Sequence, residues 1–113
     1  MTNYLIPADR LTLSLLDVRL LIALLDGQNV GYDIARRSEK ELGNRRIYTA
    51  NAYKALFKLE KMMLVVNIGA VNSNDSRQKS VYKITSIGKS VLTHELYELK
   101  GLISIGEHKL ESK

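Results

Sequence analysis

The sequence predicts a small, mainly α-helical domain with one β-hairpin, an α+β arrangement. Three observations lead to this prediction: apolar residues recur at helical spacing in several stretches, two neighbouring stretches are rich in β-branched residues, and capping or turn residues separate them. The chain has 113 residues, of which 45% are hydrophobic and 26% charged. This length and composition are typical of one globular domain, and we expect it to span 1–113.

Two helices are expected in the first half of the chain, after an N-terminal arm or short extra helix over 1–9. The first helix is predicted over about 12–26, and it ends at Gly27, which suits a left-handed cap because it has no Cβ. A short link, 28–30, leads to a second helix over about 31–42. Glycine and asparagine follow this helix and are typical of a helix end.

A third helix and the hairpin are expected next. Thr49 is predicted to be the N-cap of a helix over 49–62, because its hydroxyl can accept a hydrogen bond from a free amide of the first turn. The segment before it, 45–48, contains β-formers and is expected to make one sheet-edge strand. Strands over about 64–71 and 78–85 surround a polar turn and make a hairpin.

A last helix is expected from about 86 to 108. The order helix, helix, small strand, helix, hairpin, helix is that of a winged helix-turn-helix domain. We therefore expect a three-helix core, a wing over 67–82 and a C-terminal helix, 86–113, available for dimerisation.

The charge of the chain is unevenly distributed. The net charge is +5, yet between Arg36 and Lys83 there are eleven Lys or Arg against four Asp or Glu, a balance of +7. The remaining residues carry six basic and eight acidic side chains, a balance of −2. This distribution favours a surface for a polyanion in the middle of the chain.

The third predicted helix has one apolar and one basic side. At the helical period, the apolar stripe contains Ala52, Leu56, Leu59 and Met63, with Ala55 at its edge. The opposite side contains Lys54, Lys58 and Lys61, with Asn51 beside them. Alone, this pattern favours an ordinary amphipathic helix with a solvated lysine face. Its position between a capped second helix and a basic hairpin favours a helix that enters the DNA major groove.

The candidate DNA-binding residues follow from this placement. Thr49, Asn51 and Lys54 would lie nearest the bases, and the planar amide of Asn51 suits adenine. Contacts to phosphates or the minor groove are expected from Arg45, Arg46, Lys58, Lys61, Arg77 and Lys79. For Arg36, Arg37 and Lys40, phosphate contact and local pairing with Glu39 and Glu41 are equally compatible with the sequence. Phe57 is expected on the exposed side, where the pattern does not explain it.

Four segments, in the same order, resemble motifs of one known family. They are LLIALLDG (20–27), GYDI (31–34), YKALFKLE (53–60) and YKITSIG (82–88). They are similar to the helix ends, recognition-helix motif and wing-to-helix junction of the PadR family of bacterial and archaeal winged-helix transcription regulators. The resemblance implies this fold, transcription regulation and double-stranded DNA as partner. Lys54 stands where the family commonly has proline, and Met63 where it commonly has glycine, which leaves the DNA sequence preference open.

A homodimer is also expected, because winged-helix regulators generally bind two-fold DNA sites. The first helix has an inward stripe of Val18, Leu21, Ile22 and Leu25, and a second apolar stripe that needs another partner. The last helix has leucine and isoleucine at heptad spacing. The predicted dimer interface comprises Leu16, Leu20, Leu24, Leu92, Leu96, Leu99 and Ile103.

Other classes of protein are less compatible with the sequence. The chain has no cysteine, which excludes a disulfide framework, a thiolate zinc site and a cysteine nucleophile. His94 and Glu98 lie one helical turn apart without a third metal ligand, and no catalytic motif is present. We expect no enzyme activity, cofactor or metal, and leave a small-molecule effector open. The apolar stretch 11–25 is too short and too charged to span a membrane. A cytoplasmic protein fits the absence of cysteine, and as a DNA-binding protein it is expected to be nucleoid-associated.

Two alternatives to a sequence-specific regulator remain. One is a sequence-neutral DNA-binding or chromatin-like protein, and the other is a winged helix used for protein interaction. Concentration of positive charge on the third helix and the hairpin argues against the second alternative. Nearly equal affinity for unrelated duplexes would identify the first.

Overall fold

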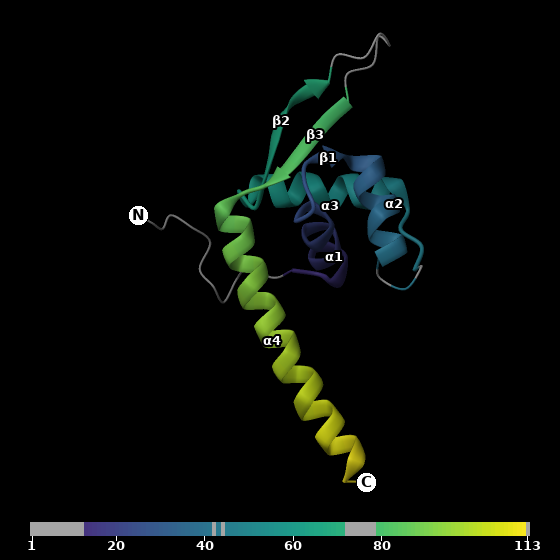
Figure 1. Cartoon of the computed structure of the whole chain (residues 1–113), viewed down its shortest axis with the longest axis vertical. Helices are drawn as coiled ribbons and strands as arrows, with labels where there is room; N and C mark the ends of the chain where they lie inside the picture. Colours follow the sequence, from purple (N-terminus) through teal and green to yellow (C-terminus); the bar gives the residue numbers. More distant parts are fainter. Residues whose placement is uncertain (1–12, 42, 44, 72–78, 113) are drawn as a thin grey trace.

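The computed structural model of the chain describes residues 13–41, 43, 45–71 and 79–112. Within them, four helices and a small three-stranded antiparallel sheet make up the fold, and the hairpin of β2 and β3 projects from one side of the helices (Figure 1), which confirms the predicted fold class. In chain order the elements are α1 (Leu15–Leu24), β1 (Asn29–Val30), α2 (Gly31–Glu41), α3 (Thr49–Lys61), β2 (Val65–Val71), β3 (Lys79–Ile84) and α4 (Ser86–Glu111). The predicted arm over 1–9 lies outside the described residues.

Helix α1 is the centre of the core. It begins with a capping box in which the Ser14 hydroxyl accepts from the Asp17 amide at 3.1 Å and the Asp17 carboxylate accepts from the Ser14 amide at 2.8 Å. The helix therefore starts three residues later than the sequence predicts. It packs against α2, α3, α4 and β3 together. Both of its apolar stripes are consequently covered within one chain, except that Leu25, predicted inward, is 49% exposed.

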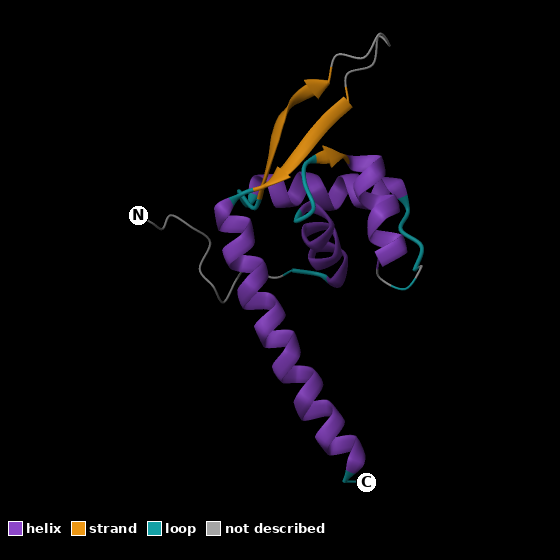
Figure 2. Cartoon of the chain, viewed as in Figure 1, coloured by secondary structure: helices purple, strands orange, loops and turns teal. Residues whose placement is uncertain are grey.

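The sheet has the strand order β1, β3, β2 (Figure 2). Strands β2 and β3 form the predicted hairpin, with Val65 opposite Ile84. The edge strand is β1, whose Asn29 pairs with Tyr82. The prediction of an edge strand at 45–48 is therefore wrong, because α2 side chains bind the backbone of this segment.

Helix α3 begins at Thr49 with Tyr48 as its N-cap, and Tyr48 makes no side-chain capping bond. The prediction of Thr49 as N-cap is thus wrong by one position. The helix ends in a tight junction with β2, in which Met63 has a φ of 65° and the Leu64 amide donates to the Leu59 carbonyl at 2.9 Å. Met63 is 58% exposed, so it is not part of the buried stripe as predicted.

Helix α4 is attached to this junction through Thr85, whose amide donates to the Leu64 carbonyl at 3.0 Å and whose hydroxyl makes further bonds. The Thr85 Oγ1 accepts from the Gly88 amide at 2.9 Å and donates to the Met63 carbonyl at 2.7 Å. Gly88 packs so closely that a Cβ there would lie 2.1 Å from the Leu64 carbonyl oxygen. Leu92 is 2% exposed and the half-buried Leu99 still packs against the core, whereas the last turns of α4 project from the body (Figure 1). None of the described helices is both long and apolar enough to cross a membrane.

Candidate nucleic-acid interface

Helix α3 divides into the two faces that the sequence predicts. Ala52, Ala55, Leu56 and Leu59 are buried against the core. The exposed face carries Ala50, Asn51, Tyr53, Lys54, Phe57, Lys58 and Lys61, whereas the half-buried Glu60 lies to one side. This face therefore presents cationic, amide and aromatic groups and no exposed carboxylate, which suits an anionic ligand.

Lys58 has an intramolecular partner that the sequence does not reveal. Its ammonium group forms an ion pair with the carboxylate of Asp17, whose side chain is 1% exposed, while that of Lys58 is 46% exposed. The second carboxylate oxygen of Asp17 has no hydrogen-bond partner in the described part of the chain. Because the buried charge depends on Lys58, this lysine links α3 to α1 and is not simply a free contact for phosphate.

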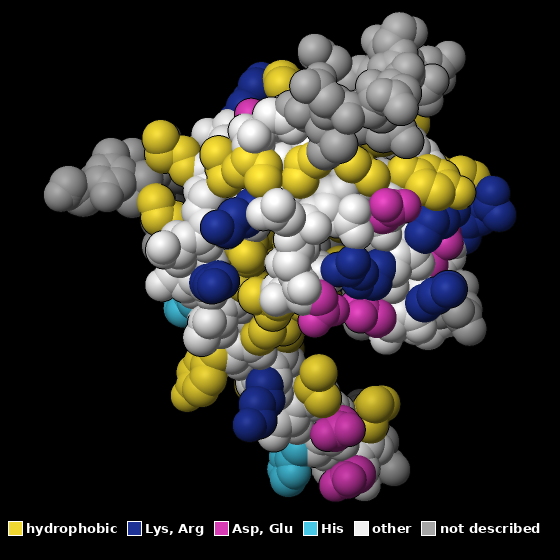
Figure 3. Space-filling view, turned by 45° about the horizontal axis from the view of Figure 1, so that its top comes forward, with side chains coloured by type: hydrophobic (Ala, Val, Ile, Leu, Met, Phe, Trp, Pro, Cys, Tyr) yellow, Lys and Arg dark blue, Asp and Glu magenta, His cyan; other side chains and the backbone are white. Residues whose placement is uncertain are grey.

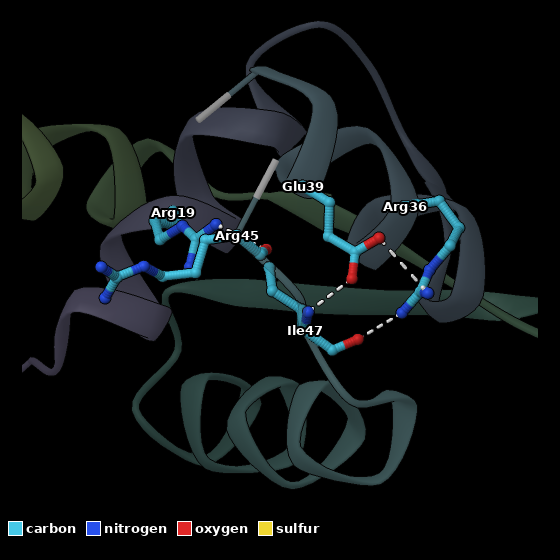
Figure 4. Close-up of polar contacts among 5 residues, drawn as sticks. All are labelled: Arg19, Arg36, Glu39, Arg45 and Ile47. Atoms are coloured by element: carbon cyan, nitrogen blue, oxygen red, sulfur yellow. Dashed lines mark hydrogen bonds and ion pairs between the residues drawn. The ribbon is translucent and has the colours of Figure 1, made fainter. Parts of the chain in front are cut away.

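The segment that leads into α3 is fixed by side chains from α1 and α2 (Figure 4). Arg36 donates to the Ile47 carbonyl, and Glu39 accepts from the Ile47 amide. The guanidinium of Arg36 also lies 3.3 Å from the Glu39 carboxylate. Arg19 of α1 donates to the Arg45 carbonyl at 3.2 Å. We call Arg36, Glu39 and Ile47 the α2 clamp; it fixes where α3 begins.

Arg36 and Arg37 both stabilise the fold through hydrogen bonds to backbone carbonyls. Arg37 donates to the Ala23 carbonyl at 3.1 Å, and Arg36 belongs to the α2 clamp. Of the two possibilities left by the sequence, local pairing therefore holds for Arg36 with Glu39. The i, i+3 spacing of Arg36 and Glu39 in the sequence indicates their ion pair. Nothing in the sequence indicates that both side chains also bind the backbone of Ile47.

Arg45 and Arg46 are both exposed directly before α3. The guanidinium of Arg46 lies 5.3 Å from the centroid of the Tyr48 ring, which orients the side chain. Because the backbone beneath them is fixed, both charges are presented at the start of the helix. They remain candidates for phosphate contact.

The wing is described only at its base. Arg77 lies outside the described residues, and so does the side chain of Lys79. At the base, burial raises the pKa of the Tyr82 hydroxyl above 10.0, Glu60 and Tyr53 raise it further, and a hydrogen bond with Ser80 lowers it. In Figure 3 a band of hydrophobic side chains crosses the upper part of the described surface. Exposed residues of the hairpin include Val66 and Ile68, at 42% and 47%.

The predicted dimer residues fall into two groups. Leu20, Leu24 and Leu92 are between 0% and 2% exposed, so the prediction that they form an interface is wrong: they fill the core. Leu16 and Leu99 are half-buried, and Leu96 and Ile103 are 39% and 60% exposed. Sequence periodicity indicates that a helix face is apolar, but it does not tell whether that face is covered by the same chain or by a second copy.

The remaining predicted DNA-binding residues lie near the start of α3. Thr49 is half-buried at the start of α3, and Asn51 and Lys54 line a hollow of about 290 Å³ between α3 and the start of α1. Among the described residues, no group of three or more His, Asp or Glu side chains is arranged to hold a metal ion.

A three-helix core with an exposed basic third helix and an antiparallel hairpin defines the winged helix-turn-helix class of regulators. The sequence profile described as the transcriptional regulator PadR-like family matches residues 20–94. The chain therefore belongs to the PadR-like family of transcriptional regulators. Among proteins with curated descriptions, none matches the sequence.

Solved structures of transcriptional regulators share this fold. A PadR family regulator from Clostridium difficile R20291 superposes with a TM-score of 0.73 at 21% identity, covering 86% of this chain and 99% of that chain. The Bacillus subtilis PadR in complex with operator DNA gives a TM-score of 0.66 at 26% identity, covering 75% of this chain and 48% of that chain. The regulator BldR from Sulfolobus solfataricus gives 0.65 at 25% identity, covering 84% and 61% of the two chains.

Proposed function

We propose that this PadR-like regulator binds a two-fold operator sequence as a homodimer, with α3 in the major groove and the hairpin on the flanking backbone or minor groove. The observation that carries the proposal is the exposed face of α3, which has three lysines and Asn51 and no exposed acidic side chain. The α2 clamp supports it, because a fixed helix start orients the first turn toward base edges. The family relative from Bacillus subtilis was solved with operator DNA.

The test is a binding measurement on the promoter region beside the gene and on scrambled DNA over a salt series. Specific binding should exceed binding to scrambled DNA by about a thousandfold or more, and both should weaken steeply as salt rises. The variant Lys54→Glu should abolish specific binding. Its matched control is Lys100→Glu on α4, which makes the same charge change away from α3 and should bind as the parent protein does.

Each alternative has its own outcome in this experiment. Equal affinity for operator and scrambled duplexes would identify a sequence-neutral DNA-binding protein instead. Absence of DNA binding at low salt would favour a protein-interaction module. Unchanged binding by Lys54→Glu would contradict the assignment of α3 as the recognition helix.

For the dimer, we propose the projecting part of α4 as the contact surface. Its exposed apolar residues include Leu102, Ile103, Ile105 and Leu110, each between 57% and 77% exposed. A helix with so much exposed apolar surface is stabilised by packing on a second copy. Sedimentation at micromolar concentration should give twice the chain mass, and Ile103→Asp should give the mass of one chain. A single-chain mass for the parent protein would contradict the proposal.

We propose repression as the mode of action, in which the bound dimer blocks access to the promoter. Such a protein would be found with the nucleoid in the cytoplasm. A reporter gene behind the operator should be expressed more strongly when the regulator carries Lys54→Glu. Lower expression with that variant would instead identify an activator.

A further inference from the structure

Phe57 lies in the middle of the exposed face of α3. The buried residues Ala52, Ala55, Leu56 and Leu59 define the inward direction of the helix. At 3.6 residues per turn, the positions opposite them are 50, 54, 57 and 61, which form one line along the helix. Phe57 is 57% exposed, so the structure places a large aromatic ring on the line farthest from the core.

The ring is held in place by its neighbour one turn later. The ammonium nitrogen of Lys61 lies 4.6 Å from the ring centroid of Phe57, a cation–π contact. This contact restrains the ring on the outer surface of the helix. An exposed ring on this line is available for contact with a ligand that approaches α3 from outside.

The surroundings of the ring indicate a nucleic acid as that ligand. Lys54 and Lys61 flank Phe57 on the same line, and none of the exposed side chains of α3 is acidic. A protein partner with an apolar pocket would need no such row of cations, whereas DNA phosphates complement it. In the major groove, only thymine carries an apolar group, the C5-methyl, and phenylalanine is one of the side chains that contact it.

We propose that Phe57 is a specificity residue that selects thymine in each half-site by contact with its C5-methyl group. Ala50, on the same exposed line, has a side chain small enough for the helix to approach the base edges closely. Lys54 and Lys61 supply charge on either side of the ring. The proposal rests on the proposed function, because it requires α3 to enter the major groove.

The experiment compares thymine with deoxyuridine, which pairs in the same way and lacks only the methyl group. The preferred duplex is first selected from random DNA with the full chain, and each thymine is then replaced in turn. At one position per half-site, deoxyuridine should weaken binding by the parent protein about fourfold, the ratio that follows from about 0.8 kcal/mol for one buried methylene-sized group. Phe57→Ala should bind the two duplexes equally well.

Two control variants separate the inference from the proposed function. Phe57→Ala should keep the thermal stability and the salt slope of the parent protein. Lys54→Ala should weaken binding to the thymine and deoxyuridine duplexes by the same factor. If deoxyuridine is tolerated at every position, or if Phe57→Ala keeps the preference for thymine, the inference is wrong and DNA binding stands. If the parent protein shows no preference for any duplex, the proposed function fails and the inference fails with it.

Discussion

Removal of the Lys58 charge should destabilise the fold because it leaves Asp17 as a buried charge without its partner. Removing one member of a buried ion pair costs about 3–5 kcal/mol. Here the Lys58 side chain is 46% exposed, so water reaches one side of the pair, although Asp17 is 1% exposed. We therefore expect Lys58→Met, which keeps an unbranched apolar side chain, to lower the free energy of unfolding by about 2 kcal/mol. For a chain of 113 residues, that corresponds to a decrease of about 8 °C in Tm.

The assay is urea and thermal unfolding followed by circular dichroism at one fixed protein concentration. Lys54→Met makes the same chemical change on the exposed line of α3 and should lie within about 0.5 kcal/mol of the parent protein. The double variant Asp17→Asn with Lys58→Met should lose less unfolding free energy than the two single variants lose together. The difference, the coupling energy, should be about 1–2 kcal/mol. A Lys58→Met variant as stable as Lys54→Met, or a coupling near zero, would refute the reasoning.

The same pair of variants tests how Lys58 contributes to DNA binding. A lysine that neutralises one phosphate contributes about 0.9 to the slope of log affinity against log salt. Lys54→Met should reduce the slope by about that amount. Lys58→Met should reduce it less, because its ammonium already has Asp17 as counterion. Equal reductions would show that DNA displaces the carboxylate.

Three further predictions follow from the packing and the hydrogen bonds. Gly88→Ala places a Cβ 2.1 Å from the Leu64 carbonyl oxygen, so urea unfolding should show a loss of about 3 kcal/mol; an unchanged midpoint would contradict this packing. Glu39→Ala leaves the buried Ile47 amide without its acceptor and should cost about 1–3 kcal/mol and speed amide exchange at Ile47, while Glu39→Gln should lose less. Because the pKa of Tyr82 is raised above 10.0 in the fold, the unfolded chain loses this proton first. The contribution of Tyr82 to stability should therefore be present in full below pH 10 and be lost as the pH rises further. Unfolding measured between about pH 8 and pH 11 should show a shallower fall for Tyr82→Phe.

The elements that depend on local chemistry could be predicted from the sequence. Helical spacing identified α1, α2, α3 and α4, because each helix buries apolar residues at that spacing against the core. The β-branched content on either side of a polar turn identified the hairpin. The inward residues of α3 were predicted for the same reason, apart from Met63, where the chain already turns into β2 with a φ of 65°.

The features that were missed depend on contacts distant in the sequence or on very short elements. Strand β1 has two residues, too few for any alternation to be visible. The ion pair of Asp17 with Lys58 joins residues 41 positions apart, which no periodicity within one helix can reveal. Two apolar stripes on one helix predict two partners, which places Leu20 and Leu24 at a dimer interface. Helices of the same chain cover both stripes.

The hydroxyl of Thr85, which joins the end of α3 to the first turn of α4, has a consequence for operator geometry. Thr85 connects β3 directly to α4 and bonds to the end of α3. In a dimer built on α4, the distance between the two recognition helices would therefore be set by the register in which the two α4 helices pack. A slip of one heptad would displace them by about 10 Å, roughly a third of a turn of DNA. The spacing of the half-sites would then be encoded in the apolar residues of α4, far from any base that α3 contacts.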